Sequence, residues 1–361
     1  MSLDQNKAEQ FADRLVNALN DGALCLMTSI GHRTGLFDVM GEMPASTSEA
    51  IAKGANLDER YVREWLGAMT TSGVVEYNPN EQTYELPAEH AAFLTRNATP
   101  DNIAVFTQYI PLLGTVEDDI VKCFREGGGV PYSRYTRFHT VMAEDSGQTV
   151  LSSLLEHIIP LVPGVKEKLE RGIRVLDVGC GSGRAINLLA EHFPNSEFVG
   201  VDLSSEAIEQ ARQEAREKNL QNASFIVKDL SRFDVEAEPE HYDLITTFDA
   251  VHDQAKPLSV LKGIARTLKD DGVYLMQDIH GSSHVHNNTS HPIGPLLYTI
   301  SCMHCMTVSL AQGGDGLGAM WGQEKAKQLL NEAGFTNIHI HQLAHDFQND
   351  YYIVTKQGMA A

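Results

Sequence analysis

The sequence predicts an α/β protein: a doubly wound, seven-stranded sheet that follows an N-terminal helical region. From residue 174 onward, short apolar runs alternate with polar segments of helix length, which is typical of parallel strands joined by crossover helices. Five runs have this pattern: residues 174–178, 197–201, 224–227, 244–248 and 273–277. Two further runs, 338–342 and 351–355, are separated only by a loop, so we expect them to pair antiparallel at a sheet edge.

The first hundred residues have a different pattern. Helical periodicity begins with Phe11, Leu15 and Leu19. Two short helices and then two strands are expected to follow, at residues 46–54, 57–73, 74–77 and 82–86. This order of helix, turn, helix and hairpin resembles a winged-helix domain.

The composition is that of an acidic globular protein. The 361 residues include 28 basic and 48 acidic ones, which gives a formal net charge of −20. Residues 1–100 contain seven basic and fourteen acidic residues, whereas DNA-reading modules carry a basic stripe. The sequence therefore predicts no nucleic-acid partner. It favours a role in dimerisation or substrate capping for the winged helix.

Neither the start of the chain nor its apolar segments indicate export or membrane insertion. The first residues do not combine a basic end with an apolar run. The most apolar stretch, residues 151–165, contains two prolines and a glutamate. Five cysteines are an odd number spread over a long chain, which favours reduced thiols. The expectation is a cytoplasmic protein with no membrane partner.

A glycine-rich turn follows the first strand of the α/β region. The segment 177–183 reads Asp-Val-Gly-Cys-Gly-Ser-Gly, and glycines allow a sharp turn and a close approach of a ligand to the backbone. Asp202 and Asp229 end the next two strands, where ligands bind in open α/β sheets. Asp177 suits a ligand that bears an ammonium group, whereas it would repel a pyrophosphate. The pattern therefore favours S-adenosyl-L-methionine over NAD.

With these motifs, residues 174–356 resemble a class I S-adenosylmethionine-dependent methyltransferase. Together with the winged helix, the chain is similar to an actinobacterial-type family of largely uncharacterised methyltransferases. Its architecture is similar to that of small-molecule O-methyltransferases, whose winged-helix domains mediate dimerisation. The resemblance implies a Rossmann-like sheet with a reversed last strand, a small-molecule substrate and a homodimer. The expected domains are a winged-helix domain, a helical connector with a substrate cap, and a cofactor domain, at residues 1–100, 101–170 and 171–361.

The resemblance also implies which residues contact the cofactor. The expected contacts are Asp177, Gly179, Cys180, Gly181 and Gly183 for the methionine part, Asp202 and Leu203 for the ribose, Asp229 and Leu230 for the adenine, and Phe248 and Asp249 for the sulfonium. The catalytic candidates are His252 and Asp253, because plant-type O-methyltransferases place a catalytic histidine at a comparable His-Asp step. Alternatively, His252 is structural and caps the helix that begins near Pro257.

A segment rich in histidine and cysteine follows the fifth strand. Five of the fifteen histidines lie in residues 278–306, and Cys302 and Cys305 form a Cys-x-x-Cys pair. Zinc takes such ligands, but only one pair is present, so a polar substrate pocket is favoured and no metal is expected. The residues predicted to bind substrate are Tyr135, His139, His280, His284, His291, Tyr298, Cys302, His304, Cys305 and Trp321.

Two alternatives remain open at this point. The aromatic and basic segment 132–139 lines the mouth of the substrate pocket, or its Arg134 and Arg137 pair with Glu126 and Glu144.

The expected reaction is methyl transfer to a small molecule, with oxygen favoured over nitrogen or sulfur as the acceptor atom. The competing function is that of a winged-helix regulator that senses S-adenosylmethionine without turnover.

Overall fold

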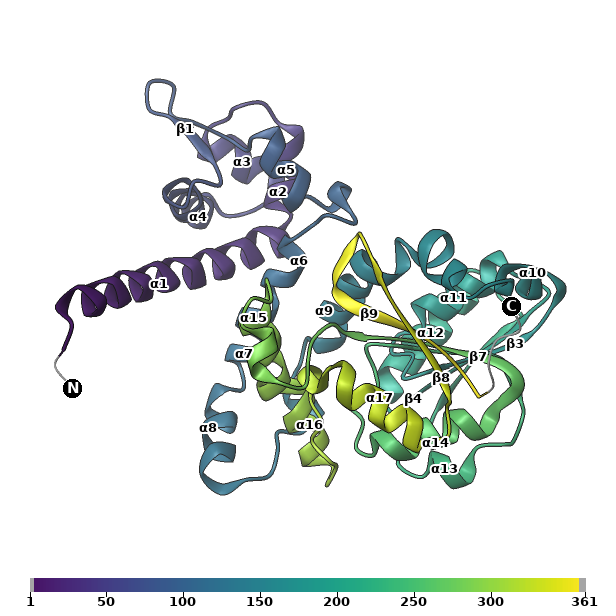
Figure 1. Ribbon diagram of the computed structural model, residues 1–361. Helices are drawn as coiled ribbons and strands as arrows, with labels where there is room; N and C mark the ends of the chain where they lie inside the picture. Colours follow the sequence, from purple (N-terminus) through teal and green to yellow (C-terminus); the bar gives the residue numbers. More distant parts are fainter. Residues whose placement is uncertain (1–2, 357–361) are drawn as a thin grey trace. The chain divides into compact units, whose positions relative to one another are not determined.

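The computed structural model describes residues 3–356, which form two compact units (Figure 1). The first unit ends at Gly114, and the second begins at Thr115. The predicted connector, residues 101–170, is thus divided between the two units. No helix within residues 3–356 is long and apolar enough to cross a membrane.

The N-terminal unit contains a long helix, a cluster of short helices and a small hairpin. Its elements are α1 (Gln5–Thr34), α2 (Leu36–Glu42), α3 (Ser48–Ala55), α4 (Glu59–Thr71), β1 (Glu76–Asn78), β2 (Thr83–Glu85), α5 (Ala88–Leu94), η1 (Arg96–Ala98), α6 (Ala104–Thr107) and α7 (Tyr109–Gly114). Helix α3 begins two residues later than expected, because the Thr47 side chain caps it by accepting a hydrogen bond from the Ala50 amide. Asp58 caps α4 in the same way.

The core of this unit lies between α1, α2, α3 and α4. The rings of Phe37 and Trp65 pack edge to face at 5.3 Å, and the Trp65 indole donates a hydrogen bond of 2.8 Å to the Met27 carbonyl. Strands β1 and β2 pair antiparallel, and an additional bridge joins Ser46 to Tyr84. The predicted winged-helix arrangement is confirmed.

The second unit is built on a seven-stranded sheet with the strand order β5-β4-β3-β6-β7-β9-β8. The strands are β3 (Arg174–Val178), β4 (Glu197–Asp202), β5 (Ala223–Val227), β6 (Tyr242–Phe248), β7 (Leu268–Ile279), β8 (Asn337–Leu343) and β9 (Asp346–Thr355). The first five are parallel, whereas β9 runs antiparallel to both β7 and β8. This confirms the predicted sheet with its reversed last strand.

Helices cover both faces of the sheet. One face packs against α10 (Val165–Arg171), α11 (Arg184–His192) and α12 (Ser205–Glu217), and the other against α13 (Phe233–Glu236), α14 (Pro257–Thr267) and α17 (Gly322–Glu332). Neighbouring residues of β3 therefore enter different cores: Val175 belongs to the first and Leu176 to the second. Both side chains are buried, as expected of a parallel strand covered on both faces.

The remaining helices of the second unit precede the sheet or follow β7. They are α8 (Glu117–Glu126), η2 (Tyr132–Arg134), α9 (Phe138–Ser146), η3 (Gly147–Leu151), η4 (Leu154–Ile158), η5 (Ile159–Leu161), η6 (Val285–Asn288), α15 (Gly294–Ile300), η7 (Ser301–Cys305), α16 (Met306–Ala311) and η8 (Ala319–Trp321). Arg134 forms an ion pair with Asp119 at 2.8 Å, so its expected pairing with Glu126 is wrong. Asp119 lies on α8, 15 residues before Arg134 in the sequence. Sequence spacing alone did not indicate that the fold brings these two side chains together.

Candidate active site

The glycine-rich turn connects β3 to α11. Gly179, Gly181 and Gly183 have φ angles of 75°, 52° and 68°, in the left-handed region that favours glycine. A Cβ atom at Gly183 would lie 2.4 Å from the ring of Phe225, and one at Gly179 would lie 2.6 Å from the Cβ of Ala250. The turn therefore requires glycine for both its backbone conformation and its packing.

Asp177 precedes this turn and is 2% exposed. Its Oδ1 accepts a hydrogen bond of 2.8 Å from the Thr246 hydroxyl on the neighbouring strand β6. Burial, with a smaller contribution from the nearby Asp202, raises the pKa of Asp177 to about 7 against the lowering effect of the Thr246 hydrogen bond. A cationic ligand group beside Asp177 would favour its ionised form.

Two further carboxylates stand at the ends of the adjacent strands. Asp202, at the end of β4, accepts hydrogen bonds from the amides of Gly181 at 2.9 Å and Ser204 at 2.8 Å. Asp229, just after β5, accepts one from the Ser231 amide at 2.9 Å. Since β3, β4 and β5 are parallel, all three carboxylates lie on the same side of the sheet, at the carboxyl ends of these strands.

These groups open into a cavity of about 550 Å³. The cavity brings together thirteen of the predicted site residues, which are Tyr135, His139, Asp177, Gly179, Cys180, Gly181, Asp202, Leu203, Asp229, Leu230, Phe248, Asp249 and Asp253. Other predicted residues of this unit do not line it: Gly183, His252, His280, His284, His291, Tyr298, Cys302, His304, Cys305 and Trp321.

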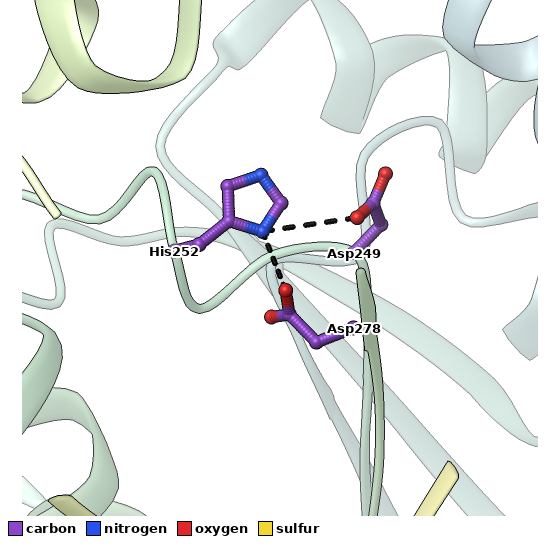
Figure 2. A group of neighbouring side chains, drawn as sticks. All are labelled: Asp249, His252 and Asp278. Atoms are coloured by element: carbon purple, nitrogen blue, oxygen red, sulfur yellow. Dashed lines mark hydrogen bonds and ion pairs between the residues drawn. The ribbon is translucent and has the colours of Figure 1, made fainter. Parts of the chain in front are cut away.

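His252 lies behind the cavity wall and is 3% exposed. Its Nδ1 is 2.8 Å from Oδ1 of Asp278 and 3.7 Å from Oδ1 of Asp249 (Figure 2). The N-cap of α14 is Lys256, so the helix-capping alternative for His252 is wrong. Burial lowers the pKa of His252, but the Asp278 carboxylate and a hydrogen bond with Cys305 outweigh it, and the pKa lies well above its usual value. The imidazole is therefore cationic at neutral pH.

Asp278 anchors this histidine from the end of β7. Besides His252, its Oδ1 accepts hydrogen bonds of 2.9 Å from the Ile279 amide and from the Trp321 indole. Asp249, at φ 55°, and Asp253 face the cavity, and burial raises their pKa values to about 6 and about 7, respectively. Sequence reasoning did not assign Asp278 to the site, because it identified only the segment that begins there.

Two family models match the chain. The Rv2258c-like winged HTH domain matches residues 22–96, and a model described as a methyltransferase domain matches residues 169–334. The chain carries a methyltransferase domain. This match spans the glycine-rich turn, both catalytic candidates and strands β3 to β7.

Solved structures share the fold of the whole chain. Human N-acetylserotonin methyltransferase, solved in complex with S-adenosylmethionine, is 18% identical, and the match covers 99% of each chain with a TM-score of 0.69. A putative O-methyltransferase from Nostoc punctiforme is also 18% identical, with a TM-score of 0.68 over 95% of this chain and 98% of that one. The chain thus has the fold of S-adenosylmethionine-dependent methyltransferases with a winged-helix domain.

Curated relatives match part of the chain. The ubiquinone biosynthesis O-methyltransferase of Neisseria meningitidis serogroup C is 32% identical over 114 residues, or 30% of this chain and 45% of that protein. The malonyl-(acyl-carrier protein) O-methyltransferase of Bacillus cereus is 30% identical over 169 residues, or 43% of this chain and 54% of that protein. The chain spans about half the length of the curated relatives it matches.

Aromatic side chains of η2 and α9 line part of the cavity of the methyltransferase domain. The rings of Tyr132 and Phe138, which line the cavity, pack edge to face at 5.6 Å. His304 is fully buried and stacks on Phe138 at 3.5 Å, and neither ring nitrogen of His304 has a hydrogen-bond partner within residues 3–356. Burial, with help from His252, lowers its pKa well below the usual value, so this imidazole is neutral.

Several predicted substrate-binding residues have other surroundings. His280 pairs with the buried Asp350 at 3.0 Å, and the Tyr298 hydroxyl accepts a hydrogen bond of 2.9 Å from Asn288. Within the described chain, Cys302 and Cys305 belong to no group of three side chains that could hold a metal ion. The group that could is Asp249, His252 and Asp278, whose ligand atoms lie within 4.8 Å of one another.

The sequence prediction missed other residues that line the cavity. They come from α9, η3, the start of α11, α12, the loops after β5 and β6, and α16, and include Met142, Ser146, Val150, Leu151, Arg184, Ser204, Glu206, Gln210, Lys228, Ser231, Gln254, Val308 and Gln312. Most are common surface or core residue types with no motif of their own. The one available signal was the aromatic segment 132–139, which directly precedes the missed part of α9.

Proposed function

We propose that this chain transfers the methyl group of S-adenosylmethionine to a hydroxyl oxygen of a small molecule. The observation that carries the proposal is the opening of three strand-end carboxylates, Asp177, Asp202 and Asp229, into one cavity beside a turn that only glycine fits. Similar solved structures, which include a mitomycin 7-O-methyltransferase, support an oxygen acceptor.

The residues present fit this cofactor. Asp177 suits the ammonium of its amino-acid part, and the space beside Gly181, where a Cβ atom would have no neighbour within 4 Å, leaves room for the methionine chain. Asp202 keeps unused lone pairs for two ribose hydroxyls, because a carboxylate accepts about four hydrogen bonds and it receives two. Asp229 and Leu230 face the adenine. The cofactor supplies a methyl group already activated by its sulfonium.

The chain then has to orient the acceptor and remove its proton. In-line alignment of a bound nucleophile supplies roughly 7–11 kcal/mol of the barrier. Asp253 lines the cavity, and its pKa of about 7 suits a general base at neutral pH. His252, already cationic, is a positioning residue: it holds Asp249 and is itself held by Asp278. Asp253 would accept the hydroxyl proton while the oxygen takes the methyl group, and the sulfur–methyl bond would break to leave S-adenosylhomocysteine.

Titration calorimetry of the purified chain with S-adenosylmethionine, S-adenosylhomocysteine and NAD tests the cofactor assignment. We expect micromolar binding of the first two and no binding of NAD. Methyl transfer from a labelled cofactor to a hydroxylated small-molecule panel, read by mass spectrometry, tests the reaction. Cofactor binding without transfer to any acceptor, together with a shift of duplex DNA in a gel, would favour the regulator.

We also propose that the chain forms a homodimer through α1. This 30-residue helix exposes an apolar stripe in which Phe11, Leu15 and Leu19 follow one another at spacings of four residues, with exposed fractions of 59%, 50% and 74%. The stripe continues through Leu26 and Ile30. A contiguous exposed apolar stripe is typical of a protein interface, and a helix of eight turns offers a second copy a matching surface.

A further inference from the structure

The acceptor side of the cavity is acidic. This side is formed by η2, α9, the loop between β6 and α14, and α16, and its charged lining residues are Asp249 and Asp253. Lys228 lines the cofactor side and lies over the Phe233 ring at 5.2 Å. Arg184, at the start of α11, donates a hydrogen bond of 2.5 Å to the Ala143 carbonyl of α9, and His139 of α9 also lines the cavity.

The described chain does not neutralise these two carboxylates. Asp253 receives no hydrogen bond within residues 3–356, and the buried Oδ1 of Asp249 has no hydrogen-bond partner there. The nearby cation is His252, but its Nδ1 is 3.7 Å from Asp249 and hydrogen-bonds Asp278 at 2.8 Å. Asp278 is fully buried, and its Oδ2 is also unpartnered. Three carboxylates thus share one imidazolium.

The charges of these groups do not balance, and the imbalance indicates which charge a ligand should carry. When all three carboxyl groups are ionised, a bound sulfonium offsets one of the two excess negative charges, which leaves one carboxylate at the cavity without a cation. An unpaired charge that is shielded from water is unfavourable, so a ligand that supplies a positive charge would stabilise the ionised carboxylate. A ligand that carries a carboxylate or a phosphate would add a negative charge beside these carboxylates, so we expect it to bind more weakly.

The surrounding rings favour an organic cation. Tyr132 and Phe138 present aromatic surface to the cavity, and Asp253 is close enough to Tyr132 to contribute, after burial, to the raised pKa of its hydroxyl. A carboxylate beside aromatic faces is the usual setting for binding of an alkylammonium group. The buried His304 behind Phe138 is neutral and adds no competing positive charge.

We propose that the acceptor binds as a cation: it carries a protonated amine that pairs with Asp249, an apolar body that packs against Tyr132 and Phe138, and a hydroxyl that faces Asp253. This inference rests on the proposed function, because it places the acceptor in the same cavity as the cofactor. It assigns substrate selectivity to Asp249, and it excludes acceptors that carry a carboxylate or a phosphate.

Three phenols of matched shape and different charge test the proposal: tyramine, 4-ethylphenol and 3-(4-hydroxyphenyl)propanoate. Each is titrated at pH 7.5 into the full chain saturated with S-adenosylhomocysteine. We expect tyramine to bind at least tenfold more tightly than 4-ethylphenol, and the propanoate at least tenfold more weakly. Equal affinities, tighter binding of the propanoate, or no binding of any of the three overturns the proposal.

Two variants test whether Asp249 is responsible for the difference in affinity between tyramine and 4-ethylphenol. In Asp249→Asn, tyramine and 4-ethylphenol should bind within twofold of each other, whereas Glu206→Gln, which removes a charge from the α12 side of the same cavity, should preserve the wild-type ratio. A preserved ratio in Asp249→Asn also contradicts the assignment. Retained binding of S-adenosylhomocysteine shows that each variant is folded. Its absence from the wild-type chain would instead overturn the proposed function.

Discussion

The imidazole of His252 and the carboxylate of Asp278 are joined by a 2.8 Å hydrogen bond in a nearly dry interior, where their side chains are 4% and 0% exposed. We predict that Asp278→Asn lowers the free energy of unfolding by about 3 kcal/mol, because it leaves a buried imidazolium unpaired or forces its deprotonation. Asp315→Asn, which breaks the exposed pair with Lys256, should cost less than about 1 kcal/mol. Urea denaturation at pH 7 provides the measurement.

The pair of His252 and Asp278 should also make the free energy of unfolding depend on pH. The folded-state pKa of His252 lies above its unfolded value, so its contribution is complete below about pH 6.5 and is lost as the pH rises through the folded-state pKa. In Asp278→Asn, the buried imidazole opposes protonation instead. The stability difference between wild type and variant should therefore grow between pH 8 and pH 6, and a constant difference would contradict the assigned charge.

A second prediction concerns the proton acceptor. Because Asp253 must be ionised to act, kcat/KM should rise with pH through about 7 and then level off. Asp253→Asn should lower kcat by about 10² to 10⁴ with little change in cofactor affinity. The comparison variant is His252→Gln. If His252→Gln abolishes the pH-dependent step while Asp253→Asn retains it, His252 and not Asp253 is the base.

The ribose assignment predicts a loss confined to cofactor binding. Asp202→Ala should weaken binding of S-adenosylmethionine by about 1.5–3 kcal/mol, through lost charge-assisted hydrogen bonds. Asp271→Ala, at an exposed position near the amino end of β7, should leave the affinity unchanged. Calorimetry measures both. An unaltered affinity in Asp202→Ala would mean that the carboxylate serves only the amides of Gly181 and Ser204.

The glycine-rich turn should not tolerate a methyl group. In Gly183→Ala the new Cβ meets Phe225 at 2.4 Å on a backbone with φ 68°, so we expect a stability loss of about 1–3 kcal/mol and weaker cofactor binding. Gly67→Ala, in the interior of α4 with open space around it, should be neutral or stabilising by up to about 1 kcal/mol. Thermal unfolding distinguishes the two variants.

The proposed dimer makes a prediction about α1. Leu15→Glu places a charge in the middle of its exposed apolar stripe, so light scattering coupled to size exclusion should show a monomer in place of a dimer. Asp13→Lys changes the charge of the same helix and should leave the mass unchanged. A wild-type chain that elutes as a monomer at micromolar concentration would contradict the proposal directly.

The sheet and the cofactor side could be predicted because their signals are local. Buried strands read as continuous apolar runs, and the strand-end carboxylates follow those runs directly, as Asp202 follows Val201. The acceptor side depends on contacts distant in sequence. His280 looked like a ligand, but its partner Asp350 lies 70 residues away. Trp321 likewise serves Asp278 through a bond that spans 43 residues, and no spacing rule reveals such pairs.

Strand β9 is the last strand within residues 3–356, but it lies inside the sheet, between β7 and β8. The second edge of β7 therefore has no partner until residues 346–355 have left the ribosome, and β8 cannot join the sheet before then. Four apolar side chains of β9, Tyr351, Tyr352, Ile353 and Val354, are almost completely buried. During synthesis, the nascent chain thus exposes a hydrogen-bonding edge on a strand whose far end carries Asp278. A chain truncated before residue 346 would keep that edge open to other strands, with aggregation as the expected result.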